Sequence, residues 1–385
     1  MADVRTIPLA VPATGDEEWL ALRDCLETGW LTQGPKVQAF EVAFASRHRV
    51  RHALATTSCT TALHLALSAC GIGPGDEVLV PAFTWVATAN AVVYCGARPV
   101  LVDVLPDRFT IDPAVMAAAV TERTVAAIPV HLFGLCADMD AIRAALPERV
   151  AVIEDAACAA GAAYLGTPAG AMGRAGCFSF HPRKSITTGE GGMVTTDDAD
   201  LAAMVESLRN HGASLSEAQR TQGMRPHLMP DFDRLGFNSR MTDLQAAMGV
   251  VQLGKLDRFI DERDRLAMLY REALADVSWL RPPEAPEGYR HAWQSFVTVL
   301  TDDAPVARDR LMDRLLRRGV HTRPGTHAVP ELGYYRTEHG VRPEDFPVAV
   351  KLARRSMALP LHNRMNKSDV LYVVESLKAA LDDPD

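Results

Sequence analysis

Lysine is scarce in this chain, and one lysine stands in a segment that favours amine chemistry. Only six of the 40 basic residues are lysines. Lys184 follows the apolar run 177–180, beyond Pro182, in a loop that closes on the glycines of segment 189–192. Proline forbids continuation of a central strand, and ligands of open α/β sheets bind at the carboxyl ends of strands. A solvated loop lysine is the alternative when Lys184 is taken alone.

Two consecutive carboxylates end an apolar run upstream of this loop. The run 150–153 leads directly into Glu154 and Asp155. Carboxylates at the end of a buried strand are costly unless a cation or hydrogen-bond donors satisfy them. The protonated ring nitrogen of a bound cofactor is one such cation.

A hydroxyl-rich segment and an aromatic residue follow two further runs. Segment 56–62 reads Thr-Thr-Ser-Cys-Thr-Thr-Ala and joins a strand to a helix. The amides of a helix N-terminus, with hydroxyls beside them, form a phosphate cup, although simple capping of the helix is the alternative. Trp85, after the run that ends at Pro81, offers a flat aromatic face, or is a core aromatic.

Together these features supply the parts that pyridoxal phosphate requires. They are an amine for a Schiff base, a carboxylate for the pyridinium nitrogen, a phosphate cup and a stacking face. We therefore expect pyridoxal 5'-phosphate as the cofactor.

The elements that must position these residues follow an α/β pattern. Short apolar runs alternate with helical patterns, which predicts a mostly parallel, seven-stranded sheet. The runs are 52–55, 77–80, 99–102, 124–130, 150–153, 177–180 and 193–196, and helical patterns include 60–69 and 113–120.

The C-terminal part predicts a smaller α+β domain. A long helical pattern covers 242–274 and a proline-rich break follows it; beyond the break we expect strands at 294–300 and 320–323 and helices at 306–318 and 367–381. We predict a large cofactor-binding domain over 1–260 and a small domain over 261–385. Segment 214–236 has no clear period, and so long a loop is usually functional or lies at an interface.

Composition excludes several classes of protein. A formal charge of −8 over 385 residues argues against a nucleic-acid binder. The seven cysteines show no CxxC spacing, which favours a reducing cytoplasm over disulfides or a zinc clip. The first residues show no basic region followed by an apolar run, so we expect no secretion signal.

The uncharged stretch 78–97 is broken by Pro81 and polar residues, so we expect a strand and a helix there, not a membrane span. His48 and His52 stand four apart without further ligands, and we expect no metal.

The ordered set of motifs strongly resembles the DegT/StrS-type sugar aminotransferases, which are fold type I enzymes that use pyridoxal phosphate. The resemblance covers nearly the whole chain. Its motifs lie at 27–35, 58–67, 81–90, 130–134, 153–157, 179–184, 189–193, 236–247 and 322–327.

This resemblance implies a role for each matching residue. Lys184 would form the Schiff base and move the proton, and Asp155 would hold the ring nitrogen. The remaining cofactor-binding residues would be Trp85 on the ring, Thr60, Thr61 and Ser179 on the phosphate, and Asn238 reaching the phosphate from the neighbouring subunit. That implies a homodimer with shared active sites. His327 would contact the substrate, L-glutamate would donate the amino group, and a nucleotide-linked keto-sugar would accept it.

One position departs from the family pattern, and alternatives in function stay open. Many members have His or Gln three positions after the aspartate, where this chain has Cys158. His131 ends a run and could border the site or be structural. The acceptor could instead be a keto-cyclitol or related ring ketone, and a non-catalytic regulatory protein on the same scaffold is a remote alternative. The sugar 3-dehydratases of this fold have histidine in place of the lysine, so Lys184 speaks against them.

Overall fold

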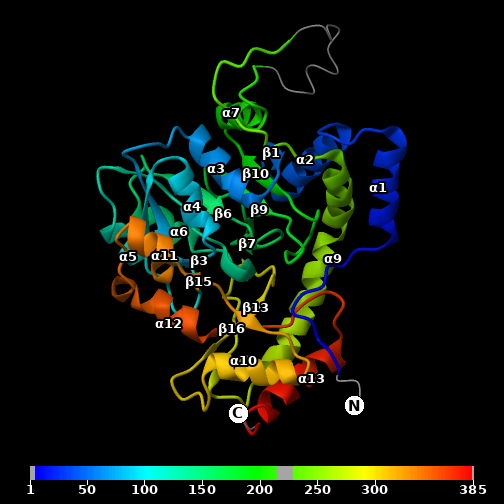
Figure 1. Cartoon of the computed structure of the whole chain (residues 1–385), viewed down its shortest axis with the longest axis vertical. Coiled ribbons are helices and arrows are strands. Elements are labelled where there is room, and N and C mark those ends of the chain that lie inside the picture. Colours follow the sequence, from blue (N-terminus) through cyan, green and yellow to red (C-terminus); the bar gives the residue numbers. More distant parts are fainter. Residues whose placement is uncertain (1–4, 215–228, 384–385) are drawn as a thin grey trace.

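The computed structural model describes residues 5–214 and 229–383, and a seven-stranded sheet lies at its centre (Figure 1). The strands follow the order β1-β10-β9-β6-β5-β2-β4. Only β10 runs antiparallel to its neighbours, and the other adjacent pairs are parallel. Their bounds are β1 His52–Thr56, β2 Glu77–Pro81, β4 Arg98–Val102, β5 Thr124–Ala127, β6 Ala151–Asp155, β9 Ala175–Ser179 and β10 Gly192–Thr196. The predicted α/β class and the mostly parallel sheet are confirmed.

Helices cover both faces of this sheet. One face packs against α3 Cys59–Ala69, α4 Ala87–Tyr94 and α7 Ala199–Arg209. The other packs against α2 Pro35–His48, α5 Pro113–Ala118, α6 Met139–Ala145 and the first half of α9 Asp243–Ala273. Successive residues of β2 alternate between the two cores, with Val78 and Val80 in one and Leu79 in the other. This period of two explains why a strand covered on both faces is a continuous apolar run.

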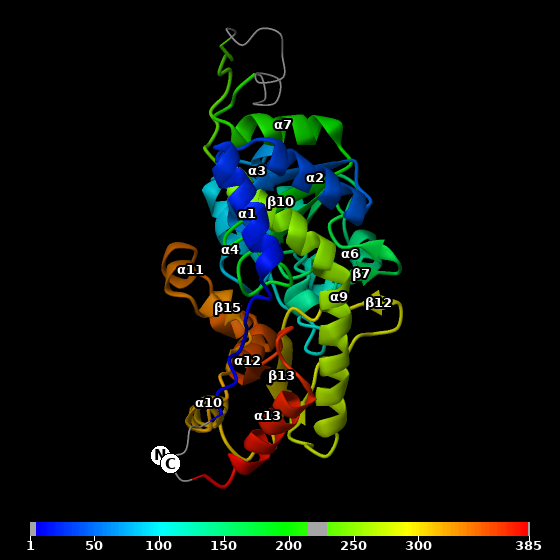
Figure 2. The ribbon, with the colours of Figure 1, turned by 90° about the vertical axis from the view of Figure 1, so that its right-hand side faces the viewer.

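A second sheet forms a smaller layer around the C-terminal half of α9. Its order is β11-β13-β16-β14, and α10 and α13 pack with it. The bounds are β11 Leu280–Arg281, β13 Phe296–Leu300, β14 Arg323–Pro324, β16 Ser356–Leu359, α10 Arg308–Arg317 and α13 Lys367–Ala379. Figure 2 shows α9 extending from the level of the large sheet to the level of β13 and α13. Since α9 continues through residue 260 and Ile7 also packs in this core, the division at 260 stays a prediction.

Short elements complete the described chain. Helix α1 Asp16–Thr28 packs on α9, and α11 Gly333–Glu338 and α12 Pro347–Arg355 lie beside the large sheet's helices. Two small sheets pair β3 Phe83–Thr84 with β15 His327–Ala328, and β12 Tyr289–Arg290 with β7 Ala163–Tyr164 and β8 Thr167–Pro168.

Two predicted strands differ from the structure in their extent. The run 124–130 leaves the ladder after Ala127, before Pro129, which has no amide to donate. The strand expected at 320–323 begins only at Arg323, and Val320 instead makes an isolated bridge to Ile7. Most of the long segment predicted at 214–236 lies outside the described residues. The uncharged stretch 78–97 forms β2, β3 and α4, and among the described residues no helix has the length and apolar character to cross a membrane.

Candidate active site

A cavity of about 350 Å³ opens beside the carboxyl ends of β6 and β9, next to the first turn of α3. Five residues expected to serve the cofactor line it, namely Thr60, Trp85, Asp155, Ser179 and Lys184. The smaller layer contributes Arg323, Gly325 and Leu359 to the lining. The strand-end rule used on the sequence therefore brings the predicted amine and the predicted carboxylate to one cavity.

The loop that carries Lys184 is held by its own hydrogen bonds. The Thr188 amide donates to the carbonyl of Phe180 at 3.0 Å, and the Lys184 amide donates to the carbonyl of His181 at 2.8 Å. At the end of the side chain, Lys184 Nζ donates to Cys158 Sγ at 3.2 Å. Burial lowers the pKa of this amine, but Cys158, Cys59 and Asp155 raise it, and the net pKa lies above its ordinary value.

Asp155 is the last residue of β6, and its carboxylate is fixed from two sides. Thr88 Oγ1 donates to Oδ2 at 2.7 Å, and the Ala157 amide donates to Oδ1 at 3.1 Å. The residue is only 5% exposed. A charged carboxylate that is buried and held by two donors is well placed to pair with a cationic ring nitrogen.

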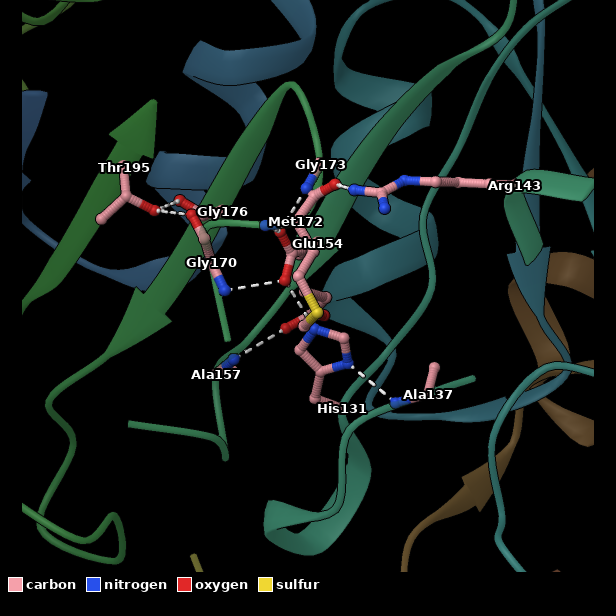
Figure 3. Close-up of polar contacts among 11 residues, drawn as sticks. His131, Ala137, Arg143, Glu154, Ala157, Gly170, Met172, Gly173, Gly176 and Thr195 are labelled. Atoms are coloured by element: carbon pink, nitrogen blue, oxygen red, sulfur yellow. Dashed lines mark hydrogen bonds and ion pairs between the residues drawn. The ribbon is translucent and has the colours of Figure 1, made fainter. Parts of the chain in front are cut away.

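Glu154 points to the other face of the sheet, where backbone amides and a histidine bind its carboxylate (Figure 3). It accepts hydrogen bonds from the amides of Gly170, Met172 and Gly173 and contacts His131 Nε2 at 2.8 Å. His131 Nδ1 accepts from the Ala137 amide at 3.0 Å, so its proton is on Nε2 and is donated to Glu154. His131 is thus a structural histidine and does not line the cavity.

The hydroxyl-rich turn before α3 combines capping with a cup that faces the cavity. Ser58 Oγ accepts from the Thr61 amide at 3.1 Å and caps the helix. The amides of Cys59 and Thr60 belong to the first turn, where an α-helix offers no acceptor carbonyl. Gly192 of β10 lies in close contact with this turn. A Cβ at Gly192 would lie 2.4 Å from the Ser58 carbonyl, so only glycine fits there without a shift. An anion can therefore approach the helix N-terminus at the point where Thr60 lines the cavity.

The remaining predicted residues do not line the cavity of this chain. The Thr61 hydroxyl is bonded to Thr57 and Ser58 within the first turn. Asn238 is exposed and bridges to Asn210, and His327 is exposed with its ring 5.4 Å from that of Trp85. Their proposed roles stay predictions.

Some lining residues were not singled out from the sequence. Arg183, Arg323 and Gln294 line the cavity, and Gln294 donates to the Arg183 carbonyl at 2.8 Å. Both arginines lie inside motifs of the resemblance, which is the signal that could have found them. Gln294 offers no such signal because its strand predicts only a core position.

The described residues contain no cluster that could hold a metal ion, and the donors fit pyridoxal phosphate instead. His48 is buried beside Phe44, and burial lowers the pKa of its imidazole to about 4. The cavity offers an amine, a held carboxylate, free first-turn amides and a half-exposed indole, which are the groups that this cofactor requires.

Known proteins resemble the chain along nearly its whole length. It is 39% identical to GDP-perosamine synthase of Caulobacter vibrioides, over 99% of this chain and 100% of that protein. It is also 39% identical to the spore coat polysaccharide biosynthesis protein SpsC of Bacillus subtilis, over 97% of this chain and 96% of SpsC. The putative sugar aminotransferase Spr1654 of Streptococcus pneumoniae, solved in its PMP-form, superposes with a TM-score of 0.91 at 27% identity, over 98% of this chain and 99% of that one.

These likenesses establish the class of the enzyme. The same pneumococcal protein was also solved in its PLP-form, which matches with a TM-score of 0.90. This chain is a pyridoxal-phosphate-dependent aminotransferase of fold type I. It belongs to the DegT/DnrJ/EryC1/StrS aminotransferase family, whose pattern it matches over residues 12–378.

Proposed function

We propose that this aminotransferase moves an amino group from L-glutamate to a nucleotide-linked keto-sugar, through a cofactor bound at Lys184. The observation that carries the proposal is the meeting of the Lys184 amine and the Asp155 carboxylate in one cavity beside the first turn of α3. Bound pyridoxal phosphate supplies an aldehyde that reacts with amines and a ring that withdraws electrons.

The residues of this chain would divide the work of binding and proton transfer. Lys184 binds the aldehyde carbon and, when displaced by a substrate amine, carries a proton between the substrate's α-carbon and the cofactor's aldehyde carbon. Asp155 keeps the ring nitrogen protonated, and Thr88 orients that carboxylate. Thr60, Ser179 and the first-turn amides of α3 hold the phosphate. Trp85 covers one face of the ring.

Charge around the cavity supports anionic substrates. Arg183 and Arg323 both line it, and within residues 5–214 and 229–383 neither guanidinium has a carboxylate partner. Guanidinium groups bind carboxylates and phosphates in a bidentate manner. Glutamate carries two carboxylates, and a nucleotide-linked sugar carries a diphosphate. The relative named GDP-perosamine synthase supports a nucleotide-linked sugar as the acceptor. A polysaccharide relative in Bacillus subtilis supports the same assignment.

The surface of α1 supports a homodimer. Glu18 is 2% exposed and pairs with Lys255 of α9, whereas Trp19 is 66% and Leu26 61% exposed on the outer face. Trp19 and Leu26 stand seven residues apart and so lie on one side of α1, where they expose apolar surface that water does not favour. Further exposed apolar side chains are Trp30, Leu31 and Val42. In such a dimer, the family pattern implies that Asn238 of one copy reaches the phosphate bound by the other.

Mutation of the α1 surface tests the dimer. Leu26→Asp should shift the protein toward a monomer in sedimentation velocity and weaken cofactor retention. Leu165→Asp is the matched control, because Leu165 is also 61% exposed but lies in the turn between β7 and β8. A dimer that is equally stable in both variants would contradict this interface.

All seven cysteines are free thiols, which supports a reducing compartment, and we propose the cytoplasm.

Spectroscopy of the purified protein tests the cofactor site. The wild type should show the absorbance band of lysine-bound pyridoxal phosphate, and borohydride should fix the cofactor on Lys184. Lys184→Ala should lose the band and turnover. Lys36→Ala is the control, since Lys36 pairs with Asp24 on the surface. A protein that stays colourless with added cofactor, or an adduct on another lysine, would sink the assignment.

A substrate panel tests the acceptor. Nucleotide-linked 3-keto and 4-keto sugars and keto-cyclitols would each be incubated with glutamate and the holoenzyme, and 2-oxoglutarate would be measured. We expect release with one class of nucleotide-linked sugar. Release with keto-cyclitols alone would replace the proposed acceptor, and failure of glutamate with every acceptor would refute the donor.

A further inference from the structure

Cys158 lies in a turn that fixes its side chain against the cavity. The turn follows β6 and is held by the Ala157 amide, which donates to Asp155 Oδ1 at 3.1 Å, and by the Ala159 amide, which donates to the Ala156 carbonyl at 2.9 Å. Its sulfur lines the cavity and accepts from Lys184 Nζ at 3.2 Å. The carboxylate expected to hold the cofactor ring thus also shapes the turn that presents this thiol.

The other polar groups near the Lys184 amine are already engaged. Asp155 accepts from Thr88 and Ala157, and the Cys59 thiol donates to the Cys177 carbonyl at 3.4 Å. His181, on the same loop, receives the Arg183 amide on Nδ1. Among the side chains that the structure describes, Cys158 is therefore the hydrogen-bond partner of this amine.

We propose that Cys158 is a positioning residue whose sulfur holds the Lys184 amine at the cofactor side of the cavity whenever that amine is not bonded to the cofactor. The inference rests on the proposed role of Lys184. A lysine side chain loses much rotamer entropy when it is held in one position, so an amine without a partner would sample many positions. Proton transfer requires the amine to stay within hydrogen-bond reach of the reacting carbon.

The contact also has an electrostatic consequence. Burial lowers the pKa of the Lys184 amine, while Cys158, Cys59 and Asp155 raise it. Removing the sulfur takes away one of the groups that stabilise the ammonium. The amine of a Cys158→Ala variant should therefore lose its proton at lower pH than that of the wild type.

The test reads the amine directly in the full-length apoprotein, without turnover. Wild type and variants would be reductively methylated with formaldehyde and cyanoborohydride over a pH series, and labelling of Lys184 quantified by peptide mass spectrometry. We expect the midpoint of Lys184 labelling to fall by about one pH unit in Cys158→Ala. Lys36 is an internal reference that should not move, and Cys70→Ala is the matched control, because Cys70 is also a partly buried free thiol but does not line the cavity.

The loaded enzyme gives the second readout. Cys158→Ala should lower kcat about 10- to 100-fold with little change in KM for the donor, since the loss acts on a free amine and not on substrate binding. Cys158→Ser should recover most of this kcat, because a hydroxyl also accepts a hydrogen bond. An unchanged labelling midpoint in Cys158→Ala, or a Cys158→Ser variant as impaired as the alanine variant, would overturn the proposal. If borohydride fixed the cofactor elsewhere than Lys184, the proposed function would fail while the labelling comparison still stood.

Discussion

Glu154→Gln should destabilise the protein far more than its conservative chemistry suggests. Each carboxylate oxygen of Glu154 faces two donors. Oε1 accepts from the amides of Met172 and Gly173, and Oε2 accepts from the Gly170 amide and from His131 Nε2 (Figure 3). Glutamine has one oxygen and one amide nitrogen, and that nitrogen is a donor in either orientation. Two donors would therefore lose their acceptor and meet another donor.

A change in the tautomer of His131 would not restore the lost hydrogen bonds without breaking another. Its Nδ1 accepts from the Ala137 amide at 3.0 Å, so moving the proton away from Nε2 would create a second clash there. A buried donor left without an acceptor costs about 1–3 kcal/mol, and two donors lose their acceptor here. We expect about 2–6 kcal/mol, which is a large part of the about 5–15 kcal/mol that stabilises an ordinary protein.

Urea unfolding with saturating cofactor, followed by circular dichroism, measures this loss. With a slope of about 1–3 kcal/mol per molar urea, the midpoint should fall by about 1 M or more. Glu148→Gln is the control, because Glu148 is exposed and such substitutions usually stay within about 0.5 kcal/mol. A Glu154→Gln variant that loses less than about 1 kcal/mol would show that these donors find other partners, and the reasoning from acceptor geometry would be refuted.

Three further predictions concern the cavity and the pH dependence of stability. Arg323→Ala should raise KM for one anionic substrate about 10- to 100-fold in steady-state kinetics, and Arg336→Ala, on an exposed helix, should not; equal KM values in both would remove Arg323 from the site. Gly192→Ala should weaken cofactor binding about tenfold in absorbance titrations, because its Cβ would press on Ser58, and unchanged affinity would contradict the close approach. Burial lowers the pKa of His48 from 6.5 to about 4, so the folded state binds fewer protons than the unfolded state between these values. Stability should therefore fall by roughly 3 kcal/mol as pH drops through this window, and His48→Gln should flatten that slope in unfolding experiments at several pH values.

The sequence predicts the large sheet well because its strands are covered on both faces. Each of the seven apolar runs became one strand of the seven-stranded sheet, with ends that moved by a few residues. Two-sided burial makes such runs continuous, so they are visible without any alignment. The smaller layer is harder to predict, because a two-residue strand such as β14 carries too little pattern to place.

Among the residues that line the cavity, those at the ends of strands of the large sheet are the easiest to predict from the sequence. Asp155 and Ser179 are the last residues of parallel neighbours, so their meeting follows from topology alone. Arg323 reaches the same cavity from the smaller layer, and that contact depends on how α9 joins the two sheets, which no local pattern encodes.

The pair Glu154 and Asp155 shows why adjacency in sequence says little about shared function. The strand period of two sends Asp155 to the face that packs against α3, where the cavity lies, and Glu154 to the opposite face, where backbone amides and His131 satisfy it. A slip of one residue in the register of β6 would exchange the two carboxylates and place Glu154 at the cavity. Because four donors fix Glu154 on its own face, such a slip would leave those donors unsatisfied as well as the new carboxylate. The structural residue therefore fixes the register that lets its neighbour face the proposed cofactor site.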